Sequence, residues 1–201
     1  DTPFRIQNEL PAEVEIPKIL DFCNRNNILL KQHNTDYLSD EYATYGMYTI
    51  ENRAIPSVID GFKPTQRKII HVANKLWKSG SEKPVKVFQL GGRIAADAHY
   101  HHGDMSLNAA IIGMAQSFKN SLPLLDEIGQ FGSLRSPEPG AARYISTKIN
   151  GNFRLIYKDF ELTESQYEEG SEIEPKFFLP IIPTVLLNGS SGIAVDSLRI
   201  S

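Results

Sequence analysis

The chain has 201 residues, of which 41% are hydrophobic and 22% are charged, and its formal net charge is −3. This composition supplies enough apolar residues for the core of one globular domain, alone or with appendages. The negative net charge excludes a protein that is strongly basic throughout. A single cysteine, Cys23, excludes an internal disulfide framework and fits a reducing compartment. The sequence has no apolar run near the ~20 residues of a membrane span and opens with no signal peptide, so we expect a cytoplasmic protein without a membrane partner.

Charge is distributed unevenly along the chain. Residues 52–94 carry nine basic and two acidic side chains, whereas residues 159–174 carry seven acidic side chains and no basic one. The local excess of positive charge predicts a phosphate-binding face that the average conceals. A solvated helix surface is the alternative explanation of the same pattern.

The first half of the chain predicts an arm followed by helices. Residues 1–35 are weakly patterned and broken by prolines, as in an arm or linker. Beyond them, apolar residues recur at helical spacing with turn signals between the runs. Four helices are predicted, over residues 36–56, 65–80, 86–100 and 104–118. We expect Asp104 or Ser106 to cap the fourth helix.

Beyond residue 120 the pattern changes to loops and strands. Residues 121–140 are rich in turn-forming residues, and the acidic residues 159–174 predict a second loop. Between them, a strand is predicted from the alternation of Ile145, Thr147 and Ile149. Several helices followed by a strand pair, with basic residues on the second helix, favour an α+β fold of the winged-helix type, in which one helix docks in a DNA groove.

Three histidines and an acid crowd into the segment AHYHHGD, at His99, His101, His102 and Asp104. Imidazole and carboxylate are common metal ligands, so a metal site is one interpretation. The other ligand-type residues of the sequence show no matching cluster, and the imidazoles could instead donate to phosphate oxygens before a helix, where the helix N-terminus favours anions. Ordinary polar packing at a loop is the third alternative.

Two further residues have two possible roles each. Tyr144 follows Arg143 in the segment AARYI, and by itself this pattern favours a half-buried strand tyrosine, one of eight tyrosines in the chain. Ile193 follows the polar loop NGSSG. It is either a core residue or an apolar wedge that enters a base step of DNA.

Six motifs occur in a fixed order along the chain: RAIPSVIDGFKPTQRK, YHHGD, IIGMAQSF, GQFGS, AARYI and PIIPTVLLNGSSGIAV. Each is weak alone. The ordered set resembles the DNA-breakage region of the type IIA DNA topoisomerases, and the resemblance covers about residues 40–195. The motifs YHHG, IIGMAQ and ARYI are most similar to the eukaryotic and phage branch of that family.

The resemblance implies an enzyme that breaks and rejoins DNA through a tyrosine. Tyr144 stands at the position of the family's nucleophile, which forms a 5′-phosphotyrosyl link while one duplex passes through another. Arg143 matches the neighbouring position that stabilises charge on the phosphate oxygens. His102 matches the histidine of the family's histidine-glycine-acid motif and is expected near the scissile phosphate.

The resemblance also implies a set of DNA contacts. These residues hold the DNA backbone rather than read its sequence, except for an isoleucine that enters a base step and bends the duplex. They are Arg53, Lys63, Arg67, Lys68, His101 and Ile193.

Cofactors and partners follow from what the motifs lack. The sequence contains no Asp-x-Asp toprim signature and no ATP-binding motif, so the resemblance implies that a toprim partner or a missing segment holds Mg²⁺. No metal is assigned to this chain, and ATP is used elsewhere in the complete enzyme. The expected partners are double-stranded DNA, a toprim/ATPase subunit or domain, and a second copy in a homodimer. The expected compartment is the cytoplasm of a bacterial or phage-infected cell, or the nucleus if the source is eukaryotic.

Three segments are expected from this resemblance. Residues 1–35 form the arm, residues 36–158 the winged-helix cleavage domain, or DNA gate, and residues 159–201 an acidic loop with the start of a tower-type segment. After GIAV the chain reads DSLRIS in place of the family's glycine turn, which indicates a truncated piece of a longer protein, an added tail or a real divergence. Two rival functions stay open: a winged-helix DNA-binding module without catalysis, and a histidine-rich metal phosphoesterase.

Overall fold

The computed structural model describes residues 41, 43–48, 53–78, 83–159, 162–168 and 170–189. The chain divides into two compact units, one of residues 1–47 with 198–201 and one of residues 48–197. In the first unit the described residues are helical. The predicted arm and the predicted wedge Ile193 lie outside the described residues. All further description concerns the second unit.

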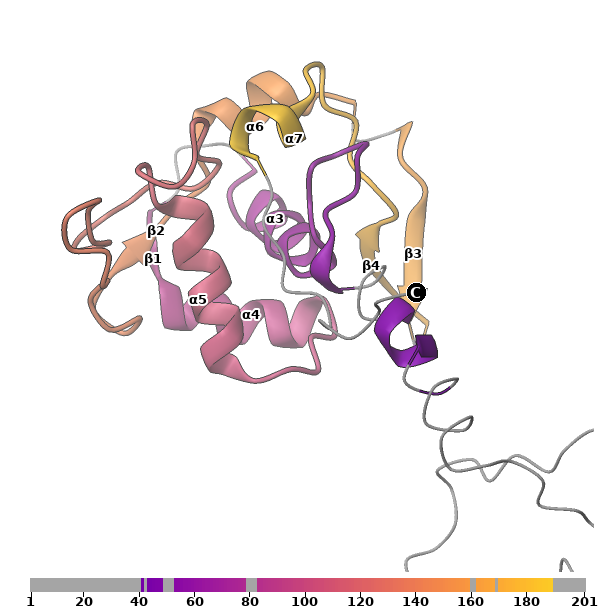
Figure 1. Cartoon of the computed structure of the whole chain (residues 1–201), viewed down its shortest axis with the longest axis horizontal. Coiled ribbons are helices and arrows are strands. Elements are labelled where there is room, and N and C mark those ends of the chain that lie inside the picture. Colours follow the sequence, from indigo (N-terminus) through magenta and orange to yellow (C-terminus); the bar gives the residue numbers. More distant parts are fainter. Residues whose placement is uncertain are drawn as a thin grey trace, which may run out of the picture. The chain divides into compact units, whose positions relative to one another are not determined.

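The second unit begins with helices and continues with short strands, as the sequence predicts (Figure 1). Its elements are α3 (Pro64–Leu76), β1 (Val85–Lys86), α4 (Val87–Asp97), α5 (Asp104–Ala115), β2 (Ser146–Thr147), α6 (Gly151–Ile156), β3 (Ser165–Glu168), β4 (Ser171–Pro175) and α7 (Thr184–Asn188). Helices α3, α4 and α5 pack against one another. Two antiparallel strand pairs, β1–β2 and β3–β4, complete the unit, so the predicted α+β class is confirmed.

Helix α3 begins where the sequence places its start signals. Pro64 occupies the first helical position, where a missing N–H costs nothing. The Lys63 N–H donates to Gln66 Oε1 at 2.9 Å, which satisfies a backbone donor that the helix leaves unpaired. After the last turn, the indole Nε1 of Trp77 donates to the Lys83 carbonyl at 3.1 Å. The helix therefore has a defined position at both ends.

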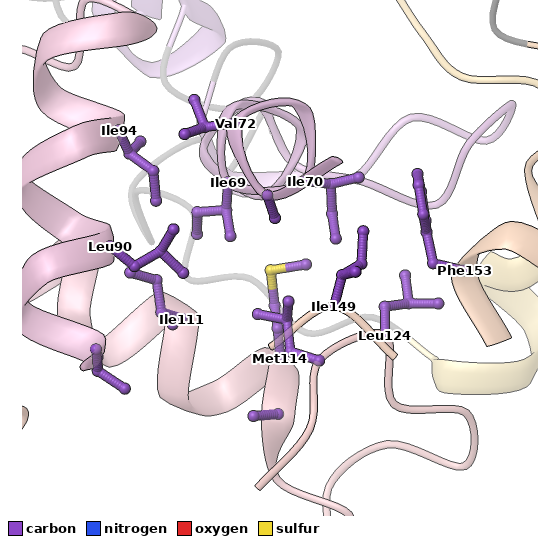
Figure 2. Close-up of a cluster of buried hydrophobic side chains, with 14 of the residues drawn as sticks. Ile69, Ile70, Val72, Leu90, Ile94, Ile111, Met114, Leu124, Ile149 and Phe153 are labelled. Atoms are coloured by element: carbon purple, nitrogen blue, oxygen red, sulfur yellow. The ribbon is translucent and has the colours of Figure 1, made fainter. Parts of the chain in front are cut away.

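One apolar core joins the three helices to the segment that follows them (Figure 2). Because helix α3 is amphipathic, its buried stripe meets apolar side chains from α4 and α5. The labelled core residues are Ile69, Ile70 and Val72 of α3, Leu90 and Ile94 of α4, Ile111 and Met114 of α5, and Leu124, Ile149 and Phe153 from later segments. The loop and strand region is thus part of the same core as the helices.

Helices α4 and α5 approach closely at Gly91. A Cβ atom at this position would lie 2.8 Å from Asn108 Oδ1, which is too close for a normal contact. The neighbouring Gly92 has open space beside it. Of the glycine pair within α4, only Gly91 therefore faces a neighbouring side chain that would have to shift to admit a Cβ atom.

A buried carboxylate, Asp60, connects several segments of this unit. Its oxygens accept hydrogen bonds from Arg67 Nε at 2.7 Å and from the backbone N–H groups of Phe62 and Phe178 at 3.0 and 3.1 Å. Its backbone carbonyl accepts from the hydroxyls of Tyr157 and Thr184, each at 2.9 Å. Burial raises the pKa of the Tyr157 hydroxyl, which keeps it a donor. The rings of four residues pack against one another in the same region: Phe62, Phe153, Tyr157 and Phe178.

The acidic stretch is a hairpin where a loop was predicted. Strands β3 and β4 pair antiparallel across a turn at Gly170, whose φ of 80° suits glycine. β4 packs against α3, and Glu174 accepts a hydrogen bond from Lys68 Nζ at 2.9 Å. The loop prediction was wrong here because residues 159–174 were interpreted by charge, whereas Ile173 anchors the hairpin through burial. Among the described residues, no packing boundary separates the hairpin from the helices that precede it.

Removal of the Asp60 charge is expected to unfold the unit more readily. Asp60→Asn leaves the Arg67 guanidinium buried beside a neutral amide, so the free energy of unfolding should fall by about 3–5 kcal/mol. Urea denaturation of both proteins measures this change. Asp97→Asn, at an exposed helix end, is the matched control and should change stability little. A loss below about 1 kcal/mol for Asp60→Asn would contradict the role given to this pair.

The packing of α3 beneath β4 makes stability depend on pH through His71. The pKa of His71 is lowered from 6.5 to about 4, and burial is the largest cause. Lys75 and Lys68 act in the same direction to a smaller extent, and Glu172 opposes them. Between these pH values the unfolded chain binds a proton that the folded protein does not, so stability should fall as pH decreases from about 6.5 to about 4. Above pH 6.5 this contribution is complete.

Thermal melts across this range test the assignment. His71→Gln removes the titrating group. The stability of this variant should therefore fall less steeply with decreasing pH than the stability of the original chain. The slope is the readout, because the substitution also changes stability at every pH. Parallel slopes for the two proteins between pH 6.5 and 4.5 would show that His71 is not responsible.

Candidate functional site

Tyr144 lies in a turn and not in the predicted strand. Residues 142–144 form the turn, closed by a hydrogen bond from the Tyr144 N–H to the Ala141 carbonyl at 2.8 Å, and β2 begins only at Ser146. The next residue, Ile145, is buried in the core, whereas Tyr144 is 68% exposed. The interpretation of Tyr144 as a half-buried strand residue is therefore wrong, because the turn projects its ring away from the surface on which Ile145 packs.

The N-terminus of α4 holds this turn in place. The first N–H groups of a helix have no partner within the helix. Here the Val87 N–H donates to the Ile145 carbonyl at 3.1 Å, and the Phe88 N–H donates to the Ala142 carbonyl at 3.2 Å. The Lys86 ammonium donates to the Tyr144 carbonyl at 2.7 Å. Three donors from residues 86–88 thus fix the backbone on both sides of an exposed phenol.

Arg143 stacks on the ring that follows it. Its guanidinium carbon lies 4.9 Å from the centroid of the Tyr144 ring, a cation–π geometry. Arg143 is exposed, and stacking by the face of the guanidinium uses none of its five N–H donors. The pair therefore presents a hydroxyl and an arginine side by side at the surface, an arrangement suited to a phosphate group.

A second feature is an open groove of about 800 Å³ between the turn before α3 and the start of α5. Arg53, Lys63 and His102, three of the predicted site residues, line it. The rings of Tyr100 and His102 contact each other edge to face at 5.4 Å between centroids. Burial raises the pKa of the Tyr100 hydroxyl, against the opposing effects of Arg53 and a hydrogen bond with Thr65.

The groove also contains a cation that the sequence prediction missed, Lys119. The signal for it was its position directly after the motif IIGMAQSF, which was used only as a family marker. Neither Tyr144 nor Arg143 lines the groove. The predicted nucleophile and the groove cations therefore do not line the same groove.

Two of the predicted DNA contacts are used inside the fold. Arg67 is only 8% exposed, and besides its bonds to Asp60 it donates to the Phe62 carbonyl at 3.3 Å. Lys68 donates to Glu174 and to the Ala98 carbonyl. This placement does not fit contacts with DNA phosphates, and we remove Arg67 and Lys68 from that set. The motif could not reveal the pairing of Lys68, because Glu174 comes from a segment 106 residues later. The partner of Arg67, Asp60, stands seven residues earlier in the same motif, but the charge pattern did not show that the pair is buried.

The histidine segment divides between two surfaces. Tyr100 and His102 line the groove, whereas His101 points elsewhere, with its Nε2 atom 3.3 Å from Glu168 Oε1 of β3. His99 lies beside His101, with 6.3 Å between the ring centroids. A single metal site made of all three histidines, one of the alternatives considered from the sequence, is therefore not what the structure contains. The predicted helix cap, Asp104 or Ser106, was also wrong, since Gly103 is the cap residue and Asp104 is already the first residue of α5.

Comparisons with known proteins agree with this architecture. Residues 53–197 match the family of the A subunits of DNA gyrase and topoisomerase IV. The chain belongs to this family and corresponds to the DNA-breakage region of type IIA DNA topoisomerases. Its solved structural neighbours include the DNA-binding, cleavage and re-ligation domain of Plasmodium falciparum topoisomerase II, with a TM-score of 0.69 and 39% identity over 80% of this chain and 22% of that one.

The relatives by sequence include phage and eukaryotic proteins. The chain is 46% identical to the DNA topoisomerase medium subunit of Enterobacteria phage T4 over 157 residues, which is 78% of this chain and 35% of the phage subunit. It is 43% identical to Arabidopsis thaliana DNA topoisomerase 2 over 79% of this chain and 11% of that protein. The chain therefore spans only part of the length of these relatives. In the part that the structure describes, every helix is too short or too polar to cross a bilayer.

The groove cations are expected to bind phosphate backbones in a salt-dependent way. Each phosphate that Arg53 or Lys119 neutralises releases counterion, so Arg53→Ala and Lys119→Ala should each weaken duplex binding for all sequences and lower the salt slope by about one. Lys176→Ala, on the hairpin and paired with Glu164, is the control and should leave the slope unchanged. Fluorescence anisotropy at several salt concentrations measures both quantities. Unchanged slopes for both groove variants would show that DNA does not occupy the groove.

Proposed function

We propose that this chain is the breakage-reunion domain of an ATP-dependent type IIA DNA topoisomerase, with Tyr144 as the nucleophile that forms a transient 5′-phosphotyrosyl link. The single observation that carries the proposal is the exposed Arg143–Tyr144 pair on a turn fixed by the N-terminus of α4. Membership of the family supports the reaction class, since the relatives are named as DNA topoisomerases.

The proposed reaction exchanges one phosphoester for another. The Tyr144 oxygen attacks the phosphorus, the bond from phosphorus to the DNA 3′ oxygen breaks, and the 3′ oxygen leaves with a proton as a hydroxyl. The 5′ end remains joined to the protein, so the reverse attack by the 3′ hydroxyl restores the DNA strand. A phenol is a weak nucleophile at neutral pH because little of it is ionised, so the site needs groups that stabilise negative charge.

Arg143 is proposed to supply part of that stabilisation. Its guanidinium lies against the Tyr144 ring, and its donors can grip the non-bridging oxygens of a phosphate that approaches the hydroxyl. His102 is proposed to hold the DNA near the scissile phosphate from the groove, together with Arg53 and Lys63. Lys86 is proposed to keep the Tyr144 backbone in place during the attack.

The residues around Tyr144 do not fit a Mg²⁺ site of this chain. Mg²⁺ prefers oxygen ligands, above all carboxylates. Within the described residues, the group of potential ligands that lies close together is His99, His101 and Glu168, and it includes no residue of the turn 141–145. We propose that a toprim partner or another segment of the full protein supplies Mg²⁺, and that ATP is used elsewhere in that enzyme.

The proposed assembly follows the family. Double-stranded DNA, a toprim/ATPase subunit or domain and a second copy of this chain are the proposed partners, and Ile193 is proposed to enter a base step. The relationship to a phage T4 protein supports a place in the cytoplasm of an infected bacterial cell. A winged-helix geometry and the start of a tower segment remain proposals within the shared α+β fold.

The rival function is a DNA-binding module without catalysis. The observation in its favour is the position of the groove cations, which can hold a duplex without any contribution from Tyr144. The two functions differ in one product, the covalent protein–DNA adduct. An experiment that detects this adduct therefore separates them.

The decisive substitution is Tyr144→Phe, which removes one oxygen and keeps the ring. We expect the fold and the DNA affinity to persist, while the covalent adduct vanishes, because phenylalanine has no nucleophile. The chain is mixed with its toprim partner, Mg²⁺ and end-labelled DNA, and the reaction is trapped with denaturant. The adduct should lie on 5′ ends. Tyr167→Phe, at a tyrosine 71% exposed on β3, is the matched control and should cleave normally.

Two results would count against the assignment. An adduct that persists with Tyr144→Phe, or one that lies on 3′ ends, would exclude Tyr144 as the 5′ nucleophile. If the original chain forms no adduct even when its partner is present, the non-catalytic DNA-binding module is favoured. Arg143→Lys should also impair cleavage severely, since an ammonium cannot reproduce a two-pronged grip on phosphate.

A further inference from the structure

We propose that His99, His101 and Glu168 form a binding site for a divalent transition metal, with Zn²⁺ as the preferred ion, that ties the turn before α5 to the β3–β4 hairpin. The three side chains offer ligand atoms that all lie within 4.8 Å of one another. The site does not depend on the proposed function, and it is separate from the Mg²⁺ that a partner is proposed to supply.

The spacing of two of the ligand atoms already suits zinc. In a tetrahedral site with bonds of about 2.0–2.1 Å, neighbouring ligand atoms lie roughly 3.3 Å apart. The distance between His101 Nε2 and Glu168 Oε1 is 3.3 Å. The His99 ring lies next to His101 at 74° to it, so a modest rotation of the His99 side chain brings a third ligand atom to the same spacing.

The local backbone separates these ligands from the groove. Tyr100 and His102 line the groove, and neither His99 nor His101 does. The φ angle of His99 is 47°, in the left-handed region that a residue with a side chain seldom adopts. The turn therefore places alternate side chains on two surfaces, one facing the groove and the other facing the hairpin.

The chemistry of the donor set favours a metal over a plain ion pair. The side chains of His101 and Glu168 are 73% and 38% exposed, and an ion pair at such a surface contributes little stability. Two imidazoles and one carboxylate are the donors that Zn²⁺ takes in sites with three protein ligands, with water at the fourth position. Mg²⁺ is disfavoured because two of the three ligands are nitrogen atoms.

Metal binding here would link two segments that are far apart in the sequence. Glu168 comes from the hairpin, whereas the histidines precede α5 by a few residues. Since His102 is the next residue after His101, a metal bond at His101 would also restrict the backbone that carries a groove residue. The ligands do not line the groove, so the metal would lie outside it.

Zinc binding to the purified chain, with any affinity tag removed, tests the proposal. Competition with a chromogenic zinc chelator gives the affinity, and the visible absorption of bound Co²⁺ reports tetrahedral geometry. His101→Ala and Glu168→Gln should each weaken binding at this site on the order of 10–100-fold, and should abolish the Co²⁺ bands. Glu164→Gln removes a carboxylate from the segment leading into the same hairpin, outside the cluster, and should bind like the original chain.

A second readout separates loss of the site from loss of the fold. Zinc should raise the melting temperature of the original chain and of Glu164→Gln, but not that of Glu168→Gln, whose melt without metal should be close to normal. Zinc affinities that are equal for the original chain and for both ligand variants would overturn the proposal. So would the absence of micromolar zinc binding by the original chain. DNA is not part of the assay, so its outcome is independent of the cleavage experiment.

Discussion

The buried carboxylate of Asp60 is the group on which the arrangement of the second unit depends. A buried charge is tolerated only where it is paired and hydrogen-bonded, and Asp60 meets this condition with Arg67 and two backbone N–H groups. Its own carbonyl binds the hydroxyls of Tyr157 and Thr184, which come from the ends of α6 and α7. One residue thus connects the turn before α3, α3 itself and three segments more than 90 residues later, as the sequence separations of its partners show. The same requirement explains why Arg67 is not available to DNA.

The candidate nucleophile depends on a second local constraint of the same kind. The unpaired N–H groups at the start of α4 need acceptors, and the turn that carries Tyr144 provides them. Ile145 anchors the turn in the core, so the phenol is exposed but its backbone is held. Rigid support of an exposed reactive group is what a nucleophile requires, since small displacements cost much of the rate. Figure 1 shows β1 leading into α4 beside β2, which brings these segments together.

The groove and the proposed metal cluster share one short segment. Residues 99–102 alternate between the two surfaces, with Tyr100 and His102 on the groove and His99 and His101 toward the hairpin. The histidine-rich segment of this chain therefore contributes side chains to two different places. The hairpin contributes to this division through Glu168, and β4 contributes to the core through its contact with α3. An acidic stretch that the charge pattern alone marks as a loop thus takes part in packing and contributes Glu168 to the proposed metal cluster.

The sequence by itself determined the helices and the family, and it pointed to Arg143 and Tyr144 as the candidate reactive pair. Helices α3 and α4 follow from local periodicity, and α3 also from nearby start signals such as Pro64, which act within a few residues and need no tertiary contact. The order of six motifs identified the family for a similar reason, since order along the chain is itself a property of the sequence. Only the tertiary structure decided that Tyr144 is exposed, that Arg67 is buried and that Glu168 meets His101. The exposure of Tyr144 and the contact of Glu168 with His101 depend on segments many residues away. Arg67 pairs with Asp60 only seven residues earlier, but its burial is a property of the folded contacts rather than of residue type.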